Sequence, residues 1–231
     1  MARWEPNASE RLVVAALDLF TQRGYENTTV IDIAERAGLT KSTFFRHFQD
    51  KREVLFGSDG LTVPLVAGIT AADPSATPLE AVAHGLQTIA REIFTPTRRA
   101  FAVQRRAVIA SHLELQEREA LKGIVLTAAM ADALTRRGVP DLLARVTAEL
   151  GALALTITYE QWTKAADTAD ESTDDTDFAD IARRAISEVQ TAASQSFRQH
   201  THTRPHPDDT PTSAAAPVHT ETGTATDADH H

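Results

Sequence analysis

Residues 29–48 constrain the fold of this chain more than any other segment, because two short helical patterns are separated there by a single glycine. Ile33 lies on the apolar face of the first pattern, and Ala37 is small at the point where two helices must approach closely. Gly38 permits a turn with positive φ, and Thr40 is of a type favoured at the start of a helix. The segment therefore predicts two short helices joined by a tight turn, which is a helix-turn-helix arrangement.

The second helix of this motif begins with side chains that suit DNA. Lys41, Ser42 and Thr43 are polar or cationic groups of the kinds that contact base edges and phosphates in a major groove. Phe44 and Phe48 follow at positions expected to anchor the helix from below. A cationic residue such as Lys41 is most often a solvated surface charge, but its place in this motif favours a contact with DNA.

The rest of the chain also has helical periodicity, and no segment has the alternating pattern of a strand. Asn7 and Glu10 have the spacing of a capping box at the start of a first helix, which Gly24 would end. A fourth helix is predicted from Asp50, because residues 50–53 repeat that spacing. Further helices are predicted over residues 79–93, 96–111, 114–137, 140–165 and 178–199. The predicted fold class is all-α.

These patterns divide the chain into four regions. Residues 1–56 are predicted to form a three-helix domain that carries the helix-turn-helix, and residues 78–199 a larger helical domain. Residues 57–77 are predicted to be a bent or broken connector, because glycine and proline interrupt any long helix there. Residues 200–231 contain hardly any large apolar side chain, so we expect a disordered tail.

Composition restricts the classes of function. The formal net charge of −9 argues against nucleic acid as a partner, but basic and acidic side chains balance within residues 1–56. The absence of cysteine excludes disulfides and thiolate chemistry. The sequence has no nucleophile elbow, phosphate loop or zinc motif, so we expect no enzyme activity, cofactor or metal. No apolar run approaches the roughly 18 residues of a membrane span, and the first residues lack an apolar signal core, which predicts a cytoplasmic protein outside the membrane.

Residues 11–56 resemble the DNA-binding domain of the TetR family of transcriptional regulators. The resemblance covers the first helix, the turn at Gly24 and Tyr25, the start of the second helix, the glycine turn, and Phe48 with Lys51. It implies that the DNA-binding residues are Thr29, Lys41, Ser42, Thr43, Phe45, Arg46, His47 and Lys51. The amide of Thr29 and the side chains of His47 and Lys51 would contact phosphates. Arg46 would either face DNA or pair with Asp50.

The family often has tyrosine where this chain has Phe45, and phenylalanine cannot donate a hydrogen bond to phosphate. The resemblance implies a homodimer that binds a palindromic double-stranded DNA operator, most often as a repressor, and is released by a small molecule. The helices at 140–165 and 178–199 would pair with their copies in a four-helix bundle, within a C-terminal ligand-binding and dimerisation domain. Such a protein would lie in the cytoplasm, associated with the nucleoid.

The effector site is less clearly marked than the DNA-binding site. The Phe-Phe-Arg-His-Phe and Tyr-Glu-Gln-Trp stretches resemble a subgroup that responds to acyl-CoA-like ligands, so a largely apolar effector is expected. The candidate ligand-binding residues are Phe94, Phe101, Gln104, Met130, Tyr159 and Trp162, each of which plain core packing would also explain.

Two alternatives remain open at this point. One is a helical enzyme with an appended DNA-binding-like module. The other is a dimeric interaction module that has lost DNA binding, which Phe45 and the acidic balance of the chain would favour.

Overall fold

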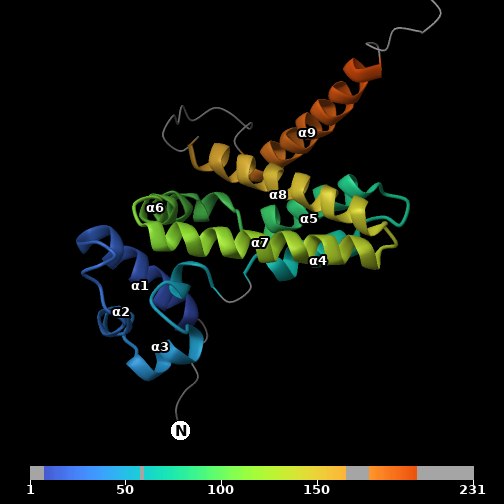
Figure 1. Ribbon diagram of the computed structural model, residues 1–231. Coiled ribbons are helices and arrows are strands. Elements are labelled where there is room, and N and C mark those ends of the chain that lie inside the picture. Colours follow the sequence, from blue (N-terminus) through green and yellow to red (C-terminus); the bar gives the residue numbers. More distant parts are fainter. Residues whose placement is uncertain (1–7, 58–59, 165–176, 202–231) are drawn as a thin grey trace, which may run out of the picture. The chain divides into compact units, whose positions relative to one another are not determined.

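A computed structural model of the chain describes residues 8–57, 60–164 and 177–201 (Figure 1). Within these residues every regular element is a helix, which confirms the all-α class. The helices up to residue 193 pack into one compact unit, and the end of the last helix belongs to a second unit. Asn7, expected to cap the first helix, and residues 202–231 of the predicted tail lie outside the described residues, whereas His200 and Thr201, also predicted to be part of the disordered tail, belong to the last helix.

The first three helices are α1 (Ala8–Arg23), α2 (Val30–Arg36) and α3 (Lys41–His47). The turn after α2 contains Gly38, whose φ is 67°. Thr29 and Asp32 form a capping box at the start of α2, and the hydroxyl of Thr40 accepts a hydrogen bond from the amide of Thr43 at 3.1 Å. Each helix of the motif is thus bounded by local capping, and the predicted helix-turn-helix is confirmed.

The helix predicted from Asp50 is wrong, because the chain forms only a short 3₁₀ helix, η1 (Glu53–Leu55). Asp50 does accept a hydrogen bond from the amide of Glu53 at 2.9 Å. The carboxylate of Glu53, however, does not return to Asp50 and instead contacts Arg118 and Lys122. Glu53, whose spacing suggested a capping box, therefore makes a long-range contact instead.

The connector predicted over residues 57–77 contains a helix, α4 (Thr62–Ala71), one face of which is buried. Pro64 lies in the first turn, where a missing amide proton removes no intrahelical hydrogen bond. Gly68 lies where α4 crosses α5 (Pro78–Glu92), because a Cβ there would be 2.8 Å from the Cα of Gly85. The glycine that suggested a break is therefore required for close packing of two helices.

The remaining helices agree with their predicted positions. Thr77 and Glu80 form a capping box at the start of α5. A short 3₁₀ helix, η2 (Pro96–Arg98), precedes α6 (Arg99–Ala110). They are followed by α7 (Leu113–Arg136), α8 (Asp141–Lys164) and α9 (Phe178–Thr201). We refer to α4–α9 as the helical body and to residues 8–57 as the N-terminal domain.

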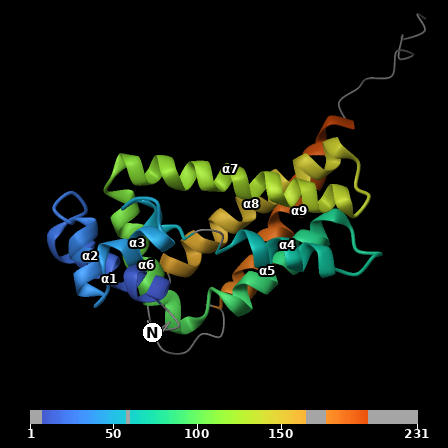
Figure 2. The ribbon, with the colours of Figure 1, turned by 90° about the horizontal axis from the view of Figure 1, so that it is seen from below.

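Two hydrophobic cores stabilise these elements. One lies in the helical body and contains Leu65, Leu86, Met130 and Trp162 among others. The other lies beneath α1–α3, but it also contains residues of the corner between α6 and α7. These are Val108, Ile109 and Leu115. In both views α1 lies beside α6 (Figure 1 and Figure 2).

One helix of the described residues, α8, is long and apolar enough to cross a membrane by length and composition alone. Its inner face is packed in the helical body, where Ala148, Ala154 and Trp162 are buried. It also carries charged side chains, including Arg145 and Glu149. Burial inside the protein accounts for the apolar character of its inner face.

Candidate DNA-binding interface and effector region

Helix α3 has one anchored face and one exposed face. Phe44 and Phe48 are buried in the core of the N-terminal domain, with their ring centroids 5.6 Å apart. Thr43 is half-buried, and its hydroxyl oxygen lies 2.9 Å from that of Thr40. The exposed side chains of α3 are Lys41, Ser42, Phe45, Arg46 and His47. The predicted DNA-binding residues of this helix therefore share one surface, except for the half-buried Thr43.

Phe45 is the apolar member of this surface. Its side chain is 49% exposed, and the ammonium nitrogen of Lys41 lies 5.9 Å from its ring centroid. The ring also makes an edge contact with Phe44, at a centroid distance of 5.5 Å. Such a ring offers a base edge an apolar contact, of the kind that recognises a thymine methyl group, but no hydrogen bond.

Two groups predicted to donate hydrogen bonds to phosphate, the amide of Thr29 and the ammonium group of Lys51, already donate to other atoms of the protein. The amide of Thr29 donates to the carboxylate of Asp32 at 2.8 Å, and these hydrogen bonds from Thr29 hold the pKa of Asp32 below its ordinary value. The ammonium group of Lys51 donates to the carbonyl oxygen of Tyr25 at 2.7 Å and lies 3.9 Å from the centroid of that ring. Lys51 has further N–H groups available, whereas the single amide proton of Thr29 is engaged.

The pairing of Arg46 with Asp50, one of two alternatives from the sequence, is not the arrangement observed. The carboxylate of Asp50 instead accepts a hydrogen bond from Arg52 at 2.8 Å. Arg46 is exposed on α3. Its position is therefore compatible with the other alternative, a side chain that faces DNA.

The N-terminal domain meets the helical body through aromatic as well as aliphatic contacts. The buried ring of Tyr25 lies between Phe20 and His112, at centroid distances of 5.0 and 5.2 Å. Burial, together with the neighbouring carboxylate of Glu114, raises the pKa of Tyr25 well above its ordinary value. The guanidinium of Arg105 donates to the carbonyl oxygen of Leu55 at 2.7 Å. Tyr25 is thus a neutral, packed residue of this junction.

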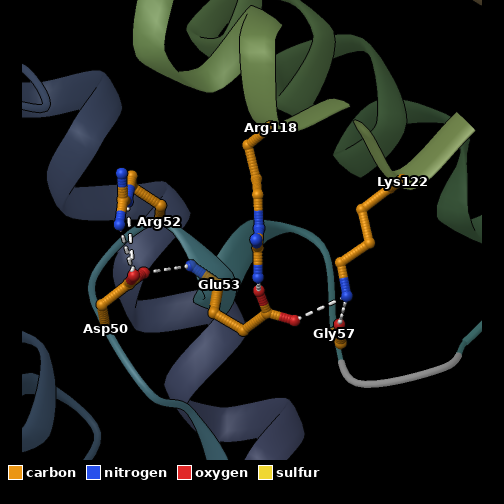
Figure 3. A network of polar contacts seen from close by, with 6 residues as sticks. All are labelled: Asp50, Arg52, Glu53, Gly57, Arg118 and Lys122. Carbon is orange, nitrogen blue, oxygen red and sulfur yellow. Dashed lines mark hydrogen bonds and ion pairs between the residues drawn. The ribbon is translucent and has the colours of Figure 1, made fainter. Parts of the chain in front are cut away.

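A buried carboxylate lies at the same junction (Figure 3). Glu53 of η1 accepts hydrogen bonds from Arg118 and Lys122 of α7, at 3.1 Å from the Arg118 Nε and 2.8 Å from the Lys122 Nζ. Burial alone would raise the pKa of Glu53, but these two cations outweigh it and the pKa is lowered. Lys122 also reaches the carbonyl oxygen of Gly57 at 3.4 Å. The sequence analysis missed this contact, because its partners are more than sixty residues apart.

Four aromatic rings form a cluster inside the helical body. Phe94 stacks on Phe178 at a centroid distance of 4.1 Å, and the rings of Tyr159 and Trp162 lie 5.7 and 5.6 Å from Phe94. The hydroxyl of Tyr159 donates to the carbonyl oxygen of Ala102 at 3.1 Å. Phe178 was absent from the predicted ligand-binding residues, although its place on the apolar face of the last helix was apparent.

The six predicted ligand-binding residues do not form one group. Phe94, Tyr159 and Trp162 come together in the aromatic cluster, and Met130 is buried in the same core. Phe101 instead packs against the core of the N-terminal domain, and Gln104 is exposed. The structure thus separates Phe101 and Gln104 from the other four.

Residues 12–57 match the model of a family described as bacterial regulatory proteins, tetR family. The HTH-type transcriptional regulator TcmR of Streptomyces glaucescens is 35% identical over 81 residues, which are 35% of this chain and 36% of that protein. The uncharacterized HTH-type transcriptional regulator YvkB of Bacillus subtilis is 39% identical over 44 residues, which are 19% of this chain and 23% of that protein. Each match therefore spans well under half of the relative's own length.

A solved structure of a TetR-family regulator from Streptomyces coelicolor is 19% identical, with a TM-score of 0.48. The alignment covers 84% of this chain and 99% of that one. The two relatives matched by sequence are both named as HTH-type transcriptional regulators. Residues 12–57 are thus similar to the N-terminal part of the bacterial regulatory proteins of the tetR family.

Proposed function

We propose that this protein is a ligand-responsive transcriptional regulator that binds a palindromic operator as a homodimer and acts as a repressor. The observation that carries the proposal is the exposed face of α3 within the family-matched domain. Lys41, Ser42 and Arg46 face outward there, while Phe44 fixes the helix from below. A short helix that presents cationic and hydroxyl groups is suited to phosphates and base edges in the major groove. The protein would act in the cytoplasm, on the nucleoid.

The outer surface of α8 supports the proposed dimer. Four of its apolar side chains are exposed in the single chain, namely Leu142, Leu143, Val146 and Leu153. Their spacing places them on one side of the helix, and exposed apolar side chains gathered on one side often mark a protein interface. Several apolar side chains of α9, including Phe178 and Ile186, are instead buried against their own chain. In the proposed four-helix bundle α8 would supply most of the apolar contact, and two recognition helices would lie about 34–36 Å apart.

We propose that a largely apolar effector, of acyl-CoA-like character, binds in the helical body next to Phe94, Tyr159 and Trp162. These residues combine large apolar faces with polar tips, as the walls of small-molecule sites do. Release from DNA requires the effector to bind more tightly to the form of the dimer that fits the operator poorly. Operator DNA must then weaken effector binding by the same factor.

A dimeric interaction module without DNA binding is the second candidate function. The engaged amide of Thr29 and the missing hydroxyl of Phe45 remove two contacts with phosphate that the family resemblance implied. The two candidates differ in one measurable property, which is sequence-specific binding to a duplex.

Selection of bound duplexes from a random pool, at one moderate salt concentration, tests the proposal. A double variant with Lys41→Ala and Ser42→Ala is the matched control, because both side chains are exposed and their loss should leave the fold intact. We expect the wild type to enrich a palindrome and the double variant to lose or change it. Enrichment of no sequence by an intact wild-type dimer would favour the interaction module. Displacement of the selected duplex by a panel of acyl-CoA compounds and free fatty acids then tests the effector class.

A further inference from the structure

The N-terminal domain is attached to the helical body at one corner, where α6 ends and α7 begins. Val108, Ile109 and Leu115 from this corner are buried in the core beneath α1–α3. Helix α4, which follows the N-terminal domain in the chain, packs on α5 and α7 and has its buried residues in the other core. The orientation of α3 therefore depends on contacts with α6 and α7.

An apolar contact alone defines this orientation weakly, because burial of apolar area has no preferred direction. Hydrogen-bonded ion pairs are directional. At this corner Glu53 is only 7% exposed, and both of its carboxylate oxygens are engaged by α7. Arg118 and Lys122 are four residues apart and so share one face of that helix. The carboxylate is thereby held between two points on a single rigid element.

Neighbouring contacts fix the same short segment. The guanidinium of Arg105 on α6 donates to Leu55 and lies 5.0 Å from the ring centroid of Phe56. Lys122 also reaches the carbonyl oxygen of Gly57. Residues 53–57 are thus held from α6 and α7 together, as Figure 3 shows for the α7 side. The ion pairs of Glu53 are not needed to bury η1, because Val54 and Leu55 of η1 are already buried.

We infer that Glu53 is a positioning residue: through Arg118 and Lys122 it sets the angle of the N-terminal domain on the body, and so the spacing of operator half-sites that the dimer accepts. This inference rests on the proposed function. One base pair rotates a half-site by about 34–36° around the duplex, since a turn contains 10–10.5 base pairs. A dimer with a fixed angle between its domains should therefore reject operators whose centre is longer or shorter by one base pair.

Substitution Glu53→Gln tests this inference. It keeps the shape of the side chain and removes the charge, and the two cations left behind are each about one third exposed, so water can solvate them. Affinities are measured for the selected palindrome, for palindromes with one base pair added or removed at the centre, and for a single half-site. We expect the discrimination between spacings to fall by about tenfold, with the base preference and the half-site affinity unchanged.

Glu160→Gln is the matched control. Glu160 also pairs with two cations, at 3.9 Å from Arg106 and 3.5 Å from Lys164, but both partners belong to the helical body. We expect this variant to keep the wild-type spacing preference. Unchanged spacing discrimination in Glu53→Gln would overturn the inference. A wild type that binds no palindrome would overturn the proposed function itself, and this inference with it.

If Glu53→Gln weakens binding to every DNA sequence, a measurement without DNA can still test the inference. The chain has no cysteine, so Gln49→Cys provides a single attachment point for a spin label on the exposed end of the N-terminal domain. Pulsed electron spin resonance then gives the distribution of distances between the two labels of the dimer. We expect a broader or displaced distribution in Glu53→Gln than in Glu160→Gln, and identical distributions would contradict the inference.

Discussion

The N-terminal domain and the helical body both have packed aromatic rings, but the N-terminal domain also exposes one ring, that of Phe45, on α3. In the N-terminal domain Phe44 points into the core while Phe45, its neighbour on α3, points outward among cationic side chains. In the helical body Phe94, Trp162 and Phe178 all pack against one another inside. The surface that we propose to bind DNA is thus already exposed on the N-terminal domain, whereas the proposed effector site would require the packed rings of the helical body to rearrange. This difference explains why the DNA-binding candidates, unlike the effector candidates, lie largely on one surface.

The two phenylalanines of α3 provide the strongest test of this contrast. Phe44→Ala should lower the free energy of unfolding by about 3–5 kcal/mol, because a fully buried ring leaves a cavity. Phe45→Ala, one residue away and 49% exposed, should change it by less than about 0.5 kcal/mol. Urea denaturation followed by circular dichroism measures both. Equal effects of the two substitutions would contradict the assigned orientation of α3.

A charged substitution on the outer face of α8 should weaken dimerisation, whereas the same substitution at another exposed apolar position should not. Leu153→Glu is expected to weaken dimerisation by about a hundredfold, since a charge would be buried at the centre of the proposed interface. Val63→Glu, which changes an even more exposed apolar residue on α4, should leave the dimer intact. Sedimentation equilibrium of both variants measures the dissociation constants. A Leu153→Glu protein that remains a tight dimer would remove α8 from the interface.

Substitutions within the DNA-binding surface should separate base recognition from phosphate contact. Ser42→Ala is expected to change which operator bases matter, by about 1–3 kcal/mol at the affected position. Lys51→Ala should weaken binding to all sequences and reduce the slope of log affinity against log salt by about one. Titrations of a set of operator variants at several salt concentrations measure both effects. An unchanged salt slope would show that the contact of Lys51 with Tyr25 is its whole role.

The smallest expected effect concerns the pH dependence of stability at the domain junction. The pKa of Glu53 is lowered by its two cations in the folded protein, so the pair contributes stability above the unfolded pKa, near 4.5, and loses it as pH falls through the lower folded pKa. Wild type should therefore lose more stability than Glu53→Gln as the pH is lowered below about 4.5. Urea unfolding of both proteins at neutral and acidic pH tests this, and parallel pH profiles would contradict it.

Local signals made most of the fold predictable. Thr29, Thr40 and Thr77 cap their helices through residues three positions away, so the capping patterns are visible in the sequence itself. Gly38 adopts the positive φ that the turn requires. The helix-turn-helix surface followed from these signals and from the spacing of Phe44 and Phe48.

The errors arose where distant residues decide the local structure. Glu53 has the spacing of a capping residue, but cations on α7 offer it two strong hydrogen bonds. Gly68 suggests a break, yet it allows α4 to cross α5 closely at Gly85. The direction of a side chain such as Phe101, which packs against the N-terminal core, also depends on tertiary contacts that periodicity does not contain.

Chemical interference with dimethyl sulfate on the selected duplex tests the central claim most directly, because this reagent methylates guanine N7 in the major groove and adenine N3 in the minor groove. The account predicts interference at guanine N7 in two clusters, related by two-fold symmetry and about one helical turn apart. It also predicts that Ser42→Ala alters the pattern within each cluster. Interference confined to adenine N3, or to a single cluster, would contradict a dimer that places two copies of α3 in the major groove.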